Sequence, residues 1–155
     1  RTFISQAVHK TLPRDEIGLA VNSALSRTQD QLHIHFSCIQ PGVAEALHRN
    51  ETKIRNQWVP FNVARLGRHY MATWVSGERL GAQNPFDLLA SILPNPEADM
   101  ANRTLVVVGF TRTGGAKGFV ILAGQVNQRS NDLGNGEELL DHTCQVATTG
   151  NKVRP

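Results

Sequence analysis

One stretch of the chain, residues 31–38, alternates strictly between polar and apolar side chains. A period of two is typical of a β-strand, in which successive side chains point to opposite faces of the sheet. The pattern predicts a half-buried strand whose apolar side chains face a core, while its polar side chains, two histidines among them, share the other face. The polar members are Gln31, His33, His35 and Ser37, and the apolar members are Leu32, Ile34, Phe36 and Cys38.

Three interpretations of this polar face are open from the residues alone. It is a solvated strand face, part of a metal site, or the centre of a nucleophilic site in which one imidazole attacks and its neighbours orient it. Zinc usually takes at least three protein ligands. No Asp or Glu follows closely, and Asp30 lies on the opposite parity, so a metal site would need a ligand from elsewhere in the chain.

The residues before this strand predict a hairpin that leads into it. A helix is expected over residues 3–11, ending before Pro13, and a short strand over residues 17–22. The polar residues 23–30 then connect two antiparallel strands. This connection would bring amide, hydroxyl and guanidinium groups near the histidines, where such groups can hold phosphate oxygens. The side chains concerned are Asn22, Arg27, Thr28 and Gln29.

After Pro41 the hydrophobic pattern alternates between helical and strand-like spacing. A helix is expected from Pro41, with apolar positions at helical spacing as far as Trp58. The other predicted elements, in chain order, are strands at 59–61 and 68–75, a helix at 84–94 capped by Asn84 with Pro85 at its first position, two apolar strands at 105–110 and 118–123 around Gly114-Gly115, a polar loop at 127–136 and a short helix at 137–144. The two all-apolar strands are expected to be buried on both faces.

Composition narrows the class of protein without identifying it. A chain of 155 residues with 40% hydrophobic and 19% charged residues fits one globular domain. The net charge of +3 comes from twelve Arg and four Lys against thirteen acidic residues. Arg forms forked contacts with phosphate, so the bias agrees with a phosphate-bearing ligand or an anionic membrane surface. The Arg residues are scattered, which disfavours nucleic acid as a partner.

The run Gln31-x-His33-x-His35 resembles the signature of the histidine-triad superfamily of nucleotide hydrolases and transferases, in which three histidines alternate with apolar residues. With Arg27-Thr28-Gln29 before it and Ser37-Cys38-Ile39-Gln40-Pro41 after it, the sequence is more narrowly similar to the bacterial CDP-diacylglycerol pyrophosphatases. Gln31 departs from the pattern, because it stands where the superfamily has its first histidine. The later stretches that share the likeness are Trp58-Val59-Pro60, Asn84-Pro85-Phe86 with Leu89-Ala90, and Asp141-His142-x-Cys144.

This resemblance implies an α+β fold of the histidine-triad type, an antiparallel sheet with helices packed on it, in a single domain over residues 1–155. It implies hydrolysis of CDP-diacylglycerol to CMP and phosphatidate. His33 would be the nucleophile, and His35 and Gln31 would orient it and stabilise the developing charge. No metal and no other cofactor is expected. The residues expected to bind the substrate are Asn22, Arg27, Thr28, Gln29 and Ser37.

The family further implies a location on the periplasmic side of the bacterial inner membrane. Its members carry an N-terminal anchor and further strands, which this chain is expected to lack. The expected partners are the nucleotide-lipid substrate and the membrane surface. Three other functions stay open: a CMP or nucleotidyl transferase with the same site residues, a non-catalytic nucleotide- or lipid-binding module, which Gln31 would favour, and a metal-dependent hydrolase.

Four smaller expectations complete the sequence reading. Cys38 and Cys144 would form a disulfide in an exported protein, unless each finds a partner elsewhere in a longer chain. His48 is expected to be a solvated helix residue, and His69 is kept as a candidate pocket residue. Apolar residues of the 58–75 stretch are the candidates for lipid access.

Overall fold

Seven strands form one antiparallel sheet in the computed structural model of this chain, which describes residues 12–63 and 66–146. The order across the sheet is β3-β4-β6-β5-β1-β2-β7. The strands are β1 (Ile17–Val21), β2 (His35–Ile39), β3 (Val59–Val63), β4 (Arg68–Ser76), β5 (Arg103–Thr111), β6 (Lys117–Gln125) and β7 (Leu140–Asp141). The helices are α2 (Pro41–Arg49), α3 (Pro85–Ala90) and α4 (Pro96–Asp99), with single 3-10 turns η1 (Arg14–Glu16), η2 (Met100–Asn102), η3 (Gln128–Ser130) and η4 (Gly136–Leu139).

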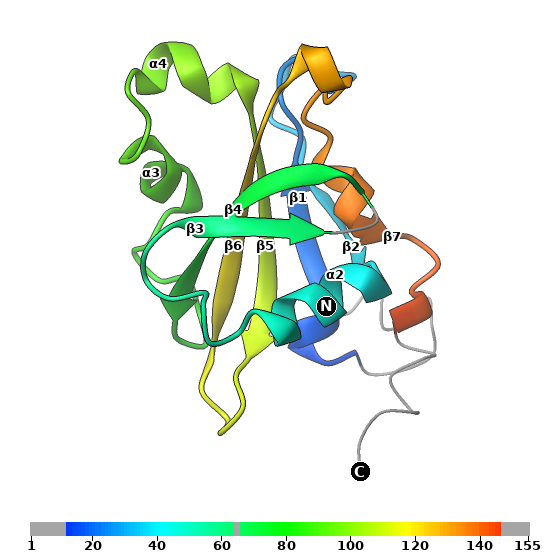
Figure 1. Ribbon diagram of the computed structural model, residues 1–155, viewed down its shortest axis with the longest axis vertical. Helices are drawn as coiled ribbons and strands as arrows, with labels where there is room; N and C mark the ends of the chain where they lie inside the picture. Colours follow the sequence, from blue (N-terminus) through cyan, green and yellow to red (C-terminus); the bar gives the residue numbers. More distant parts are fainter. Residues whose placement is uncertain (1–11, 64–65, 147–155) are drawn as a thin grey trace.

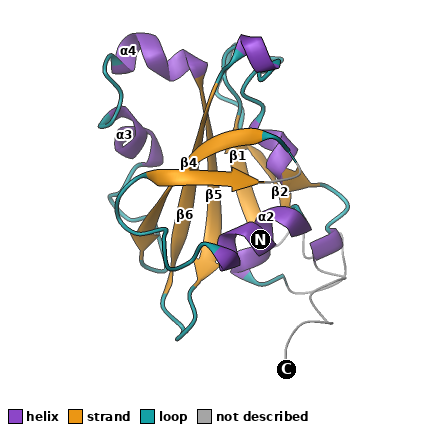
Figure 2. Ribbon diagram, viewed as in Figure 1, coloured by secondary structure: helices purple, strands orange, loops and turns teal. Residues whose placement is uncertain are grey.

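The sheet curls, so that one face is concave and encloses the main core. In Figure 1, β3 and β4 run across the front of β1 and β5, and α2 lies in front of the same strands. Because all these elements turn apolar side chains inward, their buried residues form one cluster. It includes Ala20, Ile39, Leu47, Phe61, Tyr70, Val106, Leu122 and Leu139. An antiparallel sheet with a few short helices on it is the architecture the sequence predicted, and Figure 2 shows how little of the chain is helical.

The hairpin of β5 and β6 forms the centre of this sheet. Its register runs without interruption from Arg103↔Gln125 to Thr111↔Lys117. Val106 belongs to the concave cluster, whereas Val107 packs under α3 on the convex face. The prediction of two strands buried on both faces is therefore confirmed. The turn between them uses Gly114, which has a φ of 94° that L side chains rarely adopt.

Several predicted boundaries differ from those observed. The predicted helix over 3–11 lies outside the described residues. The helix that begins at Pro41 ends at Arg49, since Asn50 closes it by donating its backbone N–H and its side-chain amide to the Ala46 carbonyl. The predicted helix at 84–94 ends at Ala90, although the Asn84 side chain does cap it by accepting from the Phe86 N–H. The separate helix α4 was not predicted.

The C-terminal helix predicted over 137–144 is wrong. The chain forms only the single turn η4 and then extends into β7, where Leu140 pairs with Ile39 of β2. Leu139 at the end of η4 and Leu140 at the start of β7 both belong to the concave core, and pairing with β2 extends the chain there. η4 thereby comes to lie beside β1 and β2.

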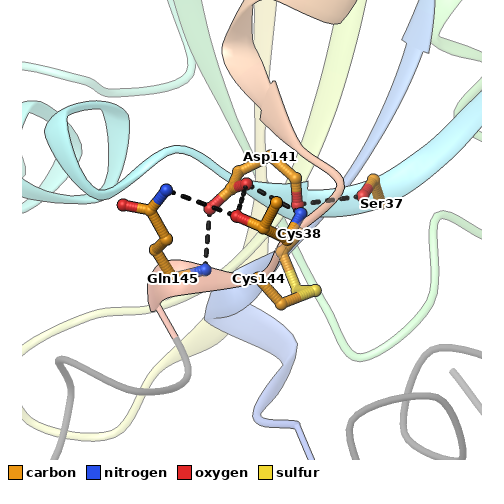
Figure 3. The surroundings of a disulfide bond; sticks show 6 residues. Ser37, Cys38, Asp141, Cys144 and Gln145 are labelled. Carbon is orange, nitrogen blue, oxygen red and sulfur yellow. Dashed lines mark hydrogen bonds between the residues drawn. A yellow bond between two sulfur atoms is a disulfide. The ribbon is translucent and has the colours of Figure 1, made fainter.

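A disulfide secures this edge of the sheet. Cys38 of β2 and Cys144 are bonded, with their Cα atoms 5.2 Å apart, so the pairing considered from the sequence is present. Figure 3 shows the carboxylate of Asp141 beside the bridge, where it accepts hydrogen bonds from the backbone N–H groups of Thr143 and Gln145. The bridge and this turn hold the segment after β7 against β2.

Candidate active site

The two histidines lie at the end of the β1–β2 hairpin where the connection 22–34 joins its strands. β2 begins only at His35, which pairs with Ala20 of β1, and residues 31–34 lead into it without strand structure. The strand predicted over 31–38 therefore starts later than expected. Because His35 pairs with Ala20, a member of the concave cluster, its ring lies on the concave side, where Gly136 of η4 approaches Ala20.

The burial predicted for the alternating apolar residues is wrong for three of the four. Cys38 is buried, but Leu32, Ile34 and Phe36 are exposed. Phe36 pairs with Leu19 on the convex face of the sheet, whereas α3 packs farther along that face, over β5 and β6. The alternation identified two faces correctly, but the position of α3 and η4 decides which of them is buried.

A small cavity of about 60 Å³ lies at this end of the hairpin. Two of its lining residues, Val21 and Leu32, are apolar. Of the eight residues predicted for the site, six line this cavity: Gln31, His33, His35, Asn22, Arg27 and Thr28. Gln29 is exposed and does not line it. Ser37 is buried and donates its hydroxyl to the Asp141 carbonyl at 3.1 Å, which directs it away from the cavity.

The two imidazoles of the cavity are close neighbours. The ring centroids of His33 and His35 are 4.5 Å apart, with an angle of 60° between their planes. His33 is exposed, and no group among the described residues hydrogen-bonds either of its ring nitrogens. A neutral imidazole in this state keeps a lone pair that can attack an electrophile.

His35, in contrast, is held at both ring nitrogens. Its Nδ1 lies 2.7 Å from Glu137 Oε1, and its Nε2 lies 3.4 Å from Asn22 Nδ2. The orientation of the Asn22 amide follows from the backbone, because its Oδ1 accepts from the N–H groups of Gly136 and Glu137. Its NH₂ group therefore faces His35, so Nε2 accepts and Nδ1 carries the proton that is donated to Glu137.

Glu137 is the residue that sequence reasoning missed. One carboxylate oxygen accepts from His35, the other accepts from Asn22 Nδ2 at 3.3 Å, and His142 Nε2 lies 3.7 Å from the first. Glu137 is far from the histidines along the chain, and the sequence pattern gave it only a place in a predicted helix. The one available signal was the likeness of the neighbouring Asp141-His142-x-Cys144 to the family.

Several hydrogen bonds fix the segment that carries Glu137. The Gln40 side chain donates to the Glu138 carbonyl at 2.7 Å, and the Tyr70 hydroxyl donates to Glu138 Oε1 at 2.8 Å. Burial, reinforced by the charge of Glu138, raises the pKa of Tyr70, which keeps the phenol protonated as a donor. At Gly134, an added Cβ would lie 2.8 Å from the Ser23 Cβ, so this segment packs directly against the β1–β2 connection.

The other histidines singled out in the sequence lie elsewhere. His48 is exposed on α2, as expected, and its ring contacts Phe110. His69 is exposed on β4, where its Nδ1 lies 3.0 Å from Asn62 Oδ1, and it does not line the cavity of His33. Among residues 12–63 and 66–146, no group of three or more His, Cys, Asp or Glu side chains is arranged to hold a metal ion.

Fold and site together define an antiparallel-sheet protein with a paired-histidine cavity at the end of one hairpin. The family model of CDP-diacylglycerol pyrophosphatase matches residues 1–148, so the chain belongs to this family. The curated CDP-diacylglycerol pyrophosphatase of Yersinia pestis is 34% identical over 146 residues, which are 94% of this chain and 55% of that protein. The chain thus spans about half the length of this relative. No helix in the described part of the chain is long and apolar enough to cross a bilayer.

Proposed function

We propose that this chain carries the catalytic centre of a CDP-diacylglycerol diphosphatase, which hydrolyses CDP-diacylglycerol to CMP and phosphatidate. One observation carries the proposal: a chain of the CDP-diacylglycerol pyrophosphatase family brings His33, whose ring nitrogens have no hydrogen-bond partner among the described residues, beside a fixed His35 in one cavity. A fold of the histidine-triad type and a location at the periplasmic face of a bacterial inner membrane belong to the same proposal. The disulfide supports an oxidising compartment.

In the proposed reaction, neutral His33 attacks the phosphorus that bears cytidine. An N–P bond forms as the bond to the bridging oxygen breaks, and phosphatidate leaves with the electron pair. Water then attacks the cytidylyl-imidazole, the N–P bond breaks, and CMP is released while His33 returns to its neutral form. Dividing one displacement into two in this way is the general advantage of a covalent intermediate.

The neighbouring side chains have supporting roles in this proposal. His35 and Gln31 orient His33 and stabilise the charge on the attacked phosphoryl group, while Glu137 and Asn22 hold His35 in one tautomer. Arg27 and Thr28 line the same cavity and supply donors for phosphate oxygens. Gln29 and Ser37, which lie outside the cavity, are given no contact with the reacting phosphate.

To test this, the chain reacts with CDP-diacylglycerol in the presence of a chelator. The reaction is quenched rapidly without acid, and the peptides are analysed by mass spectrometry. We expect a cytidylyl adduct on the peptide that contains His33, with CMP and phosphatidate in solution. His33→Ala should lower turnover by about a thousandfold or more and abolish the adduct. His69→Ala is the matched control, since His69 is also exposed but lies outside the cavity.

Three results would contradict parts of this proposal. Near-normal hydrolysis by the His33→Ala variant would exclude His33 as the nucleophile. Transfer of CMP to an added acceptor in preference to water would make the protein a transferase with the same site. Tight CDP binding without any product would favour a binding module.

A further inference from the structure

Four exposed apolar side chains lie near the histidine cavity, Leu19 and Phe36 on the convex face of the β1–β2 hairpin and Leu32 and Ile34 in the connection that leads into β2. Their exposed fractions are 37% for Leu19, 68% for Leu32, 51% for Ile34 and 37% for Phe36. Contiguous exposed apolar side chains commonly mark binding sites for ligands, membranes or proteins. The apolar residues of the 58–75 stretch, from which lipid access was expected, are by contrast largely buried, as Phe61, Tyr70 and Val75 illustrate.

The same face is hollowed into a groove of about 750 Å³. Leu19 pairs with Phe36 on one side and with Val107 on the other, so the three side chains share one face of the sheet. Phe119 of β6 continues this apolar lining, and charged side chains at the groove include Arg14, Glu78 and Lys117. A volume in this range is typical of a site for a ligand of drug-like size, whereas the cavity at His33 is several times too small for one.

The groove and the cavity adjoin along β1. Leu19 lines the groove and Val21, the next residue on the same face of β1, lines the cavity. Phe36, near the start of β2, also lines the groove, and Leu32, in the connection before β2, lines the cavity, with Ile34 between them in the chain. Alternate residues of a strand are about 7 Å apart, so an apolar chain that leaves the cavity beside Val21 reaches the groove at Leu19 within one such step.

We propose that this apolar surface, defined as Leu19, Ile34 and Phe36 with Leu32 at the cavity end, binds the acyl chains of the substrate. The inference rests on the proposed function and adds the lipid subsite to it. The cavity of about 60 Å³ has room for the reacting phosphoryl group only, so the diacylglycerol must leave it within a few bonds. The exposed apolar side chains begin where the diacylglycerol would leave the cavity. The imidazoles of the cavity thus meet the phosphate, and the apolar surface beside them meets the acyl chains.

The experiment compares kcat/KM for long-chain CDP-diacylglycerol in mixed micelles with kcat/KM for CDP-glycerol, which has no acyl chain. We expect Ile34→Thr to lower the ratio of the two values by about fivefold, and Leu19→Thr/Ile34→Thr/Phe36→Thr to lower it by about thirtyfold or more, because each replacement removes apolar contact area. Thr has the β-branched shape that suits the strand positions of Leu19 and Phe36. Ile92→Thr is the matched control, since Ile92 is 45% exposed but lines neither the groove nor the cavity.

A ratio that the triple variant leaves at the wild-type value, while both compounds are hydrolysed, would overturn the lipid subsite and leave the proposed function intact. Hydrolysis of neither compound by the wild-type chain would instead contradict the proposed function. In that case labelling decides the inference, because it needs no turnover. A CDP-diacylglycerol with a diazirine near the end of one acyl chain should label peptides containing Leu19 or Phe36, and unlabelled lipid should compete.

Labelling confined to other peptides would overturn the inference. If a second copy of the chain covered this surface instead, light scattering would show a dimer and these peptides would stay unlabelled by the lipid probe. This result would also exclude the proposal.

Discussion

The hairpins β1–β2 and β5–β6 lie side by side in one sheet, yet they are built differently. β5 and β6 are joined by the short turn 112–116 and are buried on both faces, with Val106 in the concave core and Val107 under α3. β1 and β2 are joined by the long connection 22–34 and are covered mainly on the concave side. The β5–β6 hairpin forms the centre of the fold, and the β1–β2 hairpin carries the candidate site.

The difference teaches where chemistry can be placed in this fold. A strand pair packed on both faces leaves little surface for a ligand, since most of its side chains are needed for packing; Val107 and Phe119 line only part of the groove. The β1–β2 hairpin presents His35 toward η4 and apolar side chains toward the convex groove. It is therefore held by means other than packing on both faces, namely the disulfide at Cys38 and the hydrogen bonds of Asn22 and Glu137.

The largest effect on stability is expected from loss of the disulfide that holds the β1–β2 hairpin. Replacing Cys38 and Cys144 together by Ala should lower the free energy of unfolding by about 4 kcal/mol, because the bridge closes a loop of more than 100 residues and so restricts the unfolded chain. Urea denaturation followed by circular dichroism measures this change. An unchanged midpoint would mean that the β1–β2 hairpin needs no covalent support.

The next effect compares one leucine from each hairpin. Leu122→Ala in β6 should cost about 3 kcal/mol of unfolding free energy, since Leu122 is fully buried and the change leaves a cavity. Leu19→Ala in β1 should cost less than about 1 kcal/mol, because this side chain is already partly solvated. The same denaturation experiment measures both variants. Equal losses would show that the convex face of β1 is as tightly packed as the centre of the sheet.

The smallest effect is expected from a change on the concave side of the β1–β2 hairpin, where Glu137 contacts His35. Glu137→Gln should lower kcat/KM by about tenfold, the equivalent of one hydrogen bond to a charged group. A Gln amide has only one acceptor oxygen, so its NH₂ group would face a donor on either His35 or Asn22.

Glu138→Gln is the control for this change. Glu138 lies next in the chain but contacts Tyr70 and Arg68, so its loss should leave kcat/KM close to the wild-type value. Equal losses of activity in the two variants would show that Glu137 acts only through the stability of η4. Steady-state kinetics with CDP-diacylglycerol, together with denaturation of each variant, separates these outcomes.

Much of the fold could be predicted because its signals are local. The apolar strands of β5 and β6, the glycine turn between them and the cap at Asn84 each follow from a few neighbouring residues. The end of α2 at Asn50 also depends on a local contact, with Ala46, which the apolar spacing alone did not show. The absence of a helix at 137–144 could not be predicted from neighbouring residues, because it depends on Leu140 pairing with Ile39, far away in the chain.

The candidate site, too, could be predicted only where its signals are local. The sequence by itself determined the two-sided alternation of residues 31–38, the pair of imidazoles and the likeness to the family, because these are properties of adjacent residues. Only the tertiary structure decided that the apolar side of this run is exposed and that Glu137 holds His35. The physical reason is that a period of two fixes which side chains share a face, whereas burial and charge at that face come from segments that pack on it from elsewhere in the chain.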